Sequence, residues 1–340
     1  MRYARWMHDG SEHDGVVVAH EGGDRLLAFA DGLTVLGATR LGLERANAAA
    51  TSLIERAWAD GSLGLAPSVS DVELLAPIEA PSVRDFVAFE EHVEGVVKSI
   101  DGDSGVVAEW YDAPTFYFTN PHSLVGSGVS IRPPVTQRLD FELEVAVIVG
   151  AVDGSDGSNL DEASAAGHVF GYSVFNDWSA RDIQSREMKV RLGPCKGKDF
   201  AATLGPWIVT AEELSDAHDA DGFLELELQV LVNGELIGSD LLSNMGWSFP
   251  QLLVYASRNS RVVPGDVLGS GTAGNGGCLA ELWGRAGTLT PPPLAEGDVV
   301  ELRVERIGEV SNVIGAAVEA VPVPRARAAS RARTRGRVSA

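Results

Sequence analysis

The chain has 340 residues, 45% of them hydrophobic and 22% charged, which is typical of an ordinary globular protein. Its formal net charge of −21 disfavours nucleic acid as a partner, and its apolar runs are too short to cross a bilayer. Cys195 and Cys278 give no disulfide framework, and the opening "MRYARWMHDG" lacks the apolar core of a signal peptide, so we expect a cytoplasmic protein.

Residues 1–75 predict a small N-terminal α+β domain. "GVVVAH" and "RLLAFA" are typical of strands, whereas "RANAAATSLIERAWADG" has the apolar spacing of a helix that ends at a glycine. The proline-containing segment 76–81 marks the predicted domain boundary. From about Asp85, the spacing of Phe86, Phe89 and the valines that follow predicts a helix.

From about residue 130 the sequence predicts many strands and few helices. "FELEVAVIVG", "VFGYSVFND", "PWIVT", "LELELQVLVNGELIG", "DVLGSGT" and "DVVELRVERIGEVSNVI" indicate strands, and the Asn-Gly pair predicts a hairpin. "DEASAAGHVFG" and "SFPQLLVYASRN" favour helices. We therefore expect a mainly β main domain over residues 76–320, a mixed β-sandwich or β-roll with helices outside, rather than a doubly wound parallel sheet.

Residues 321–340 are predicted to form a separate, disordered tail. The last 16 residues, "RARAASRARTRGRVSA", hold six arginines and no acid. A solvated terminus of this kind is common in proteins. Contact with RNA, with an acidic partner or with the protein's own surface is the alternative interpretation.

The strand "LDFELEVAVIVG", residues 139–150, places carboxylates on one side. Phe141 and Leu143 would share one face, and Asp140, Glu142 and Glu144 would share the other. Unpaired carboxylates resist burial, so this face requires a basic partner, protonation or a cation. A solvent-facing strand with exposed acids is equally consistent with this segment alone.

Three further segments carry candidate site residues. In "FNDWSARDIQ", Asp177 ends a strand as a possible oxygen ligand, and Arg181 and Gln184 share a face of the next helical turn, although capping alone would also explain the acid. His92 follows Asp85 by seven residues, a spacing that shares one helix face. "LGPCKGKDF" holds Lys198 between glycines without Walker spacing, which suits an anionic substrate oxygen rather than a nucleotide.

In combination, these motifs resemble one family. The series "RDFVAFEEHV", "DFELEVAVIVG", "FNDWSARDIQ", "LGPCKGKDF", "GSGT…LAELW" and "LAEGDVVELRVERIG" is similar to the fumarylacetoacetate hydrolase family over about residues 76–315. The resemblance implies a mixed β-sandwich roll, a homodimer, a small oxo-acid substrate and a divalent cation. Mg²⁺ is the expected cation, with Mn²⁺ or Ca²⁺ as alternatives, and catabolism of aromatic compounds is the expected setting.

The resemblance also assigns residues. The carboxylates matching the family's metal ligands are Asp85, Glu142, Glu144 and Asp177. The positions matching substrate contacts are Arg181, Gln184, Lys198, Thr272 and Tyr117. His92 and Glu281 match the pair that activates water, although Glu91 and Glu94 also lie beside His92 in the sequence. Asp140 matches no ligand position.

The resemblance implies metal-dependent hydrolysis of a C–C bond in a 1,3-dioxo acid such as an acylpyruvate or fumarylacetoacetate. The cation would act as a Lewis acid, and His92, oriented by Glu281, would take a proton from water. Lys198 and Gln184, with the backbone around 271–272, would stabilise the oxyanion and the departing enolate. Segment 85–105 would act as a glycine-containing lid. The alternatives are a decarboxylase, tautomerase, isomerase or dehydratase of a 2-oxo acid on the same site, or a metal-binding protein without activity.

Overall fold

The computed structural model describes residues 1–101 and 105–327, without the side chains of 96–101. Residues 328–340 of the predicted tail and 102–104 of the predicted lid lie outside the described residues. Within the described ranges, none of the helices combines the length and apolarity needed to cross a membrane.

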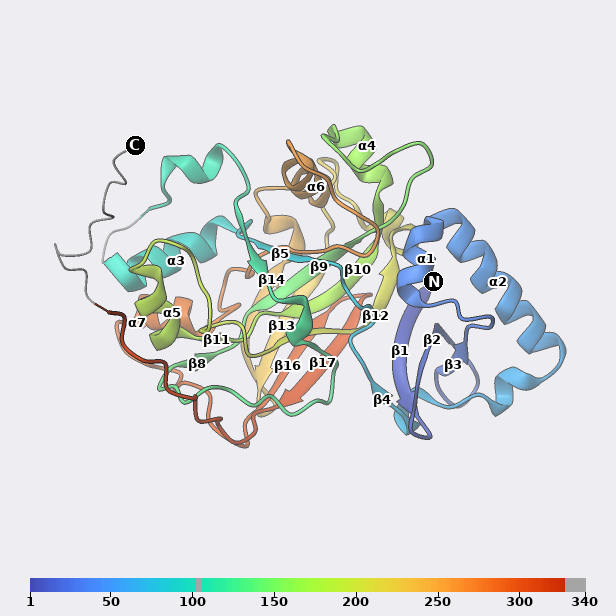
Figure 1. Cartoon of the computed structure of the whole chain (residues 1–340), viewed down its shortest axis with the longest axis horizontal. Coiled ribbons are helices and arrows are strands. Elements are labelled where there is room, and N and C mark those ends of the chain that lie inside the picture. Colours follow the sequence, from blue (N-terminus) through green and yellow to red (C-terminus); the bar gives the residue numbers. More distant parts are fainter. Residues whose placement is uncertain (102–104, 328–340) are drawn as a thin grey trace, which may run out of the picture.

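A large mixed sheet runs through the molecule in the strand order β3-β2-β1-β12-β10-β9-β15-β5-β6 (Figure 1). Its strands are β1 (Arg2–His8), β2 (Ser11–Val18), β3 (Arg25–Ala28), β5 (Val83–Phe86), β6 (Phe116–Thr119), β9 (Leu143–Val149), β10 (Val169–Asn176), β12 (Ala202–Thr210) and β15 (Val267–Gly269). Two short strands join its path, β4 (Glu73–Leu74) beside β1 and β7 (Leu124–Val125) beside β12. Most neighbours are antiparallel, so the sheet is not of the doubly wound parallel kind.

A second sheet has the order β14-β13-β16-β17. Its strands are β13 (Glu227–Val232), β14 (Glu235–Leu241), β16 (Val299–Val304) and β17 (Gly308–Val313). Asn233 and Gly234 connect β13 to β14 with φ angles of 54° and 79°, which confirms the predicted hairpin turn. Two two-residue strands, β8 (Leu139–Asp140) and β11 (Ser179–Ala180), pair separately from both sheets, and Arg181 follows β11 directly.

The helices lie around these sheets, with α1 and α2 at one end of the molecule and α3, α5 and α7 at the other (Figure 1). They are α1 (Val35–Leu41), α2 (Leu43–Ala59), α3 (Glu90–Asp101), α4 (Glu162–Gly167), α5 (Arg181–Met188), α6 (Phe249–Ser257) and α7 (Leu279–Ala286). Single-turn 3-10 helices cover Ser62–Leu65, Val69–Asp71, Ala108–Tyr111, Pro121–Ser123 and Leu242–Asn244, and a longer one covers Ala211–Ala217. Three helices predicted from the sequence are confirmed as α2, α4 and α6, although α4 ends at Gly167 and the last residues of its predicted segment lie in β10.

Strand β9 is buried on both sides, and its alternation assigns one face to each half of the core. Val145 and Val147 belong to the cluster that contains the second sheet's Val230 and Leu302. Ile148 points to the opposite cluster, which contains residues of α1 and α2. Burying one such aliphatic side chain contributes roughly 1.5–3 kcal/mol, so two-sided burial favours the centre of the sheet for β9. The layered arrangement confirms the predicted mixed β-sandwich class.

The prediction of a helix from Asp85 is wrong. Asp85 lies in β5, which pairs in parallel with β15, and α3 begins only at Glu90. Hydrogen bonding to a neighbouring strand outweighs the local apolar spacing, so Asp85 and His92 do not share a helix face. The predicted domain boundary after residue 75 stays a prediction. β1, which precedes it, pairs with both β2 and β12 and so extends the main sheet.

Candidate metal-binding active site

Neighbouring strands bring three predicted ligands together. Asp85 lies in β5, Glu144 lies in β9, and Glu142 immediately precedes β9. One carboxylate oxygen from each of these three residues lies within 4.8 Å of the others, and all three residues are buried. Because β15 pairs with both β5 and β9, the carboxylates converge at one end of three adjacent strands. We call Asp85, Glu142 and Glu144 the acidic triad.

Gly269 of β15 makes this convergence possible. A Cβ atom at this position would lie 2.7 Å from Asp85 Oδ1 and 3.0 Å from Glu144 Oε2. Any larger residue would therefore displace the two carboxylates. The absence of a side chain leaves a small space bordered by oxygen atoms.

The electrostatics of the triad favour an added positive charge. Burial, together with neighbouring carboxylates, raises the pKa of Asp85 and of Glu144 well above the usual range. Among the described residues, the buried Asp85 Oδ1 and Asp177 Oδ1 have no hydrogen-bond partner. Oxygen donors of this kind suit a hard divalent cation. The acidic triad is therefore a candidate divalent metal site.

The fourth predicted ligand, Asp177, follows β10 and lies outside the group of three. Lys198 connects it to the triad, because the ammonium group contacts the carboxylates of both Asp177 and Glu142. Tyr117 also donates a hydrogen bond to Asp177. Lys198 is 5% exposed, so this charge network is shielded from water.

Glu142 differs from the rest of the triad. Burial would raise the pKa of its carboxyl, but Arg181 and Lys198 hold that pKa well below its usual range. Arg181 Nη2 lies 2.8 Å from Glu142 Oε1, and Arg181 Nη1 donates to Gln184 Oε1 at 3.2 Å. Arg181 and Gln184 therefore share one face of α5, as the sequence predicts, and they also contact each other.

Two groups predicted to face the substrate instead hold Glu144. The Gly271 amide donates to Glu144 Oε2 at 3.1 Å, and Thr272 Oγ1 lies 3.4 Å from Glu144 Oε1. The glycine-rich loop thus positions a triad carboxylate, and the Gly271 amide is already engaged. Its predicted use for an oxyanion would require a different hydrogen-bonding arrangement.

His92 and Glu281 lie on α3 and α7, which pack against each other, but the two side chains have different polar partners. His92 Nδ1 lies 3.7 Å from Cys278 Sγ, whereas Glu281 accepts from the Gly276 amide at 3.4 Å and pairs with Arg285 at 2.6 Å. Within the described ranges, no hydrogen bond joins His92 to Glu281. Burial lowers the pKa of His92 to about 4 and raises that of Glu281 to about 7. His92 is therefore neutral at pH 7.

Two residues that the sequence reasoning set aside belong to this network. Asp140 is fully buried against Arg181, and Cys278 caps α7 while contacting His92. Cys278 stands three residues before Glu281, which is the spacing between the N-cap residue of a helix and its third residue. This spacing could have indicated in the sequence that Cys278 caps the helix of Glu281. Asp140 belongs to the same alternating acids as Glu142, but its partners come from distant segments and leave no local pattern.

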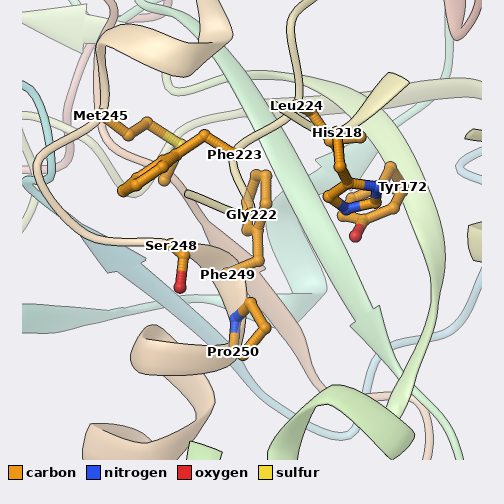
Figure 2. A pocket seen from close by; sticks show the side chains of 9 residues that line it. All are labelled: Tyr172, His218, Gly222, Phe223, Leu224, Met245, Ser248, Phe249 and Pro250. Atoms are coloured by element: carbon orange, nitrogen blue, oxygen red, sulfur yellow. The ribbon is translucent and has the colours of Figure 1, made fainter. Parts of the chain in front are cut away.

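A small cavity lies away from the acidic triad, beside Tyr172 and His218 (Figure 2). Its volume is about 10 Å³, room for about one water molecule. Phe223, Met245 and Phe249 also line it, and none of the predicted site residues does. This cavity is too small for an oxo acid, so it is not the candidate site.

Comparison with known proteins places the chain in a family. The model of the fumarylacetoacetate (FAA) hydrolase C-terminal domain matches residues 82–315. Oxaloacetate tautomerase YisK of Bacillus subtilis is 30% identical over 250 residues, covering 73% of this chain and 75% of that protein. Fumarylacetoacetase of Arabidopsis thaliana is 32% identical over 259 residues, covering 63% of this chain and 61% of that protein.

A solved structure agrees over nearly the whole length. Fumarylacetoacetate hydrolase from psychrophilic Exiguobacterium antarcticum superposes with a TM-score of 0.65 at 27% identity, covering 93% of this chain and 99% of that one. This similarity confirms the predicted fold class, and the family match confirms the resemblance on which the residue assignments depend. The chain belongs to the fumarylacetoacetate hydrolase family of enzymes, whose members matched here include hydrolases and a tautomerase.

Proposed function

We propose that this enzyme uses a divalent cation, Mg²⁺ first, to hydrolyse a C–C bond in a 1,3-dioxo acid of the acylpyruvate or fumarylacetoacetate type. The observation that carries the proposal is the buried acidic triad with a lysine on one side and a neutral histidine nearby. Identity of about 30% to relatives with different activities supports the chemistry of the site but not one substrate.

The acidic triad would hold the cation, and Asp177 would complete the set of oxygen donors. When bound, the cation supplies Lewis acidity that stabilises negative charge on substrate oxygens. The residues fit this assignment because buried donor oxygens face a space that a Cβ on Gly269 would fill.

The chain's own groups would perform the remaining tasks. Arg181 would attract the carboxylate of the substrate, and Lys198 and Gln184 would stabilise the oxyanion and the departing enolate. His92, uncharged at neutral pH, would accept a proton from water as that water attacks the distal carbonyl carbon. The bond from this carbon to the central carbon would then break, leaving a carboxylic acid and an enolate, and the enolate would take up a proton. Cys278 would orient the imidazole through Nδ1, the role that the family resemblance predicts for Glu281. Glu281 would then hold or release a proton near neutral pH, because its pKa is raised to about 7.

A tautomerase of an oxaloacetate-type acid is the second candidate. Tautomerisation requires proton transfer at carbon and oxygen but no water attack. The separate polar contacts of His92 and Glu281 favour it, because neither group depends on the other to be oriented. The similarity to oxaloacetate tautomerase YisK supports the same candidate.

The test is a panel of acylpyruvates, fumarylacetoacetate and oxaloacetate, assayed with Mg²⁺ or Mn²⁺ and with chelator. Loss of diketone absorbance, abolished by chelator and by Asp177→Ala, supports the hydrolase. His92→Gln should then reduce kcat by about 100-fold or more, the usual contribution of a general base. Conversion between keto and enol oxaloacetate, without pyruvate formation, supports the tautomerase. No metal-dependent reaction with any compound would refute both candidates.

We also propose a homodimer and a cytoplasmic location, both from the family resemblance and the sequence. Static light scattering that gives the mass of two chains supports the first proposal, and the mass of one chain contradicts it.

A further inference from the structure

Asp140 is a fully buried carboxylate whose two oxygens are shared among three segments. Oδ1 accepts from the amide of Phe141 at 2.8 Å and from the amide of Leu279 at 2.7 Å. Oδ2 accepts from the amide of Ala280 at 3.0 Å and from Arg181 Nε at 2.8 Å. Each oxygen therefore accepts from one amide of α7 and from one other residue.

These contacts connect the two sides of the candidate active site. Leu279 and Ala280 are the first two residues of α7, and the amide of the next residue, Glu281, is directed to Cys278 Sγ at 3.4 Å. Asp140 therefore accepts the first two free amides of the helix that carries Glu281. On its other side, Arg181 reaches Glu142 of the acidic triad at 2.8 Å. One carboxylate sets the spacing between α7 and the guanidinium.

We infer that Asp140 is a positioning residue: it holds Arg181 against the acidic triad and fixes the start of α7, so that groups from both sides keep one geometry. The inference rests on the proposed function, because Arg181 is taken there to attract the substrate carboxylate. Asp140 Oδ2 lies 2.8 Å from both Nε and Nη2 of Arg181, which keeps Nη2 beside Glu142 and Nη1 directed toward Gln184. Without Asp140, the guanidinium can rotate toward the triad carboxylates and away from the substrate.

Asp140→Asn removes the charge that positions Arg181 and α7 but changes the shape of the side chain little. An asparagine has one acceptor oxygen, so its NH₂ group must replace either Oδ1, facing the amides of Phe141 and Leu279, or Oδ2, facing the Ala280 amide and Arg181. Only donors are present on either side. Hydrogen bonds to charged groups contribute about 1.5–3 kcal/mol, which corresponds to about a tenfold or larger loss of affinity. The matched control is Asp161→Asn, which removes the carboxylate that caps α4. Oδ1 of Asp161 accepts a hydrogen bond from the Ser164 amide at 2.8 Å.

The first measurement is the affinity for oxalate in the presence of Mg²⁺, determined by calorimetry. Asp140→Asn should weaken the oxalate affinity by about tenfold, as expected for loss of one charged hydrogen bond. Asp161→Asn should leave the oxalate affinity within about twofold of the wild-type value. Asp140 acts through Arg181, so the double variant Asp140→Asn/Arg181→Lys should bind no more weakly than Arg181→Lys alone. Oxalate affinity unchanged in Asp140→Asn, or independent losses in the double variant, overturns the inference.

The second measurement does not depend on activity. The Nε–H resonance of Arg181, assigned by its disappearance in Arg181→Lys, should exchange slowly with solvent in the wild-type protein and rapidly in Asp140→Asn. If Asp140→Asn does not fold, faster exchange of the Leu279 and Ala280 amides in Arg181→Lys tests the same link from the other side. Unchanged exchange overturns the inference. A wild-type protein that neither binds oxalate nor converts any oxo acid refutes the proposed function instead, and the exchange data still decide the link.

Discussion

Replacing Lys198 by methionine tests the buried charge network directly. The ammonium contacts the carboxylates of Glu142 and Asp177 and is shielded from water. Methionine keeps an unbranched side chain of similar length but removes the charge, so both carboxylates lose a partner. Removing one partner of a buried ion pair destabilises a protein by about 3–5 kcal/mol.

The expected change in melting temperature follows from the chain length. At about 2.1 cal/mol/K per residue, 340 residues give an unfolding entropy of about 0.7 kcal/mol/K. A loss of 3–5 kcal/mol then lowers Tm by about 4–7 °C. The matched control is Lys196→Met, whose side chain is 72% exposed and pairs with Asp199. A surface pair contributes about 0–1 kcal/mol, so the control should lose no more than about 1.5 °C.

Scanning calorimetry with chelator, and again with excess Mg²⁺, measures both effects. A cation among the carboxylates supplies positive charge, so Mg²⁺ should reduce the deficit of Lys198→Met more than that of Lys196→Met. Equal melting temperatures for the two variants in chelator would refute the reasoning, because the carboxylates would then not depend on Lys198. A deficit that Mg²⁺ leaves unchanged would contradict cation binding beside Lys198.

Two further predictions concern the same site. Burial raises the pKa of Glu281 from 4.5 to about 7. Between these two pH values the folded state keeps the proton on Glu281, whereas the unfolded state has lost it. The folded state therefore loses stability as the pH rises from about 4.5 to 7. Glu281→Gln cannot ionise, so its Tm relative to wild type should rise between pH 5 and pH 8, and a pH-independent difference contradicts the assignment. Glu144→Gln removes one triad carboxylate and should weaken Mn²⁺ binding, measured by calorimetry, by about tenfold or more. Glu309→Gln, at an exposed carboxylate, should not weaken it. Equal Mn²⁺ affinities in the two variants would exclude Glu144 as a ligand.

Local patterns predicted those parts of the fold that depend on neighbours in sequence. The alternation in residues 139–150 correctly separated Val145 from Ala146, because successive strand residues face opposite sides. The Asn-Gly turn between β13 and β14 was predictable because few other residues adopt its positive φ angles. The same method failed at Asp85, where apolar residues of a buried strand adjoin those of α3 and imitate a longer helical repeat.

The sequence by itself therefore determined the residue types of the site, the family resemblance and the strand that carries Glu142 and Glu144 on one side. Only the tertiary structure decided how these charges are neutralised. Lys198 lies 56 residues from Glu142, and Asp140 lies 139 residues from the α7 amide that it accepts. Such partners meet because β-sheet pairing brings distant segments together, and a local repeat carries no record of which segments those are. Asp140 matches no metal-ligand position in the sequence, whereas in the structure this acid binds an arginine and the start of a helix.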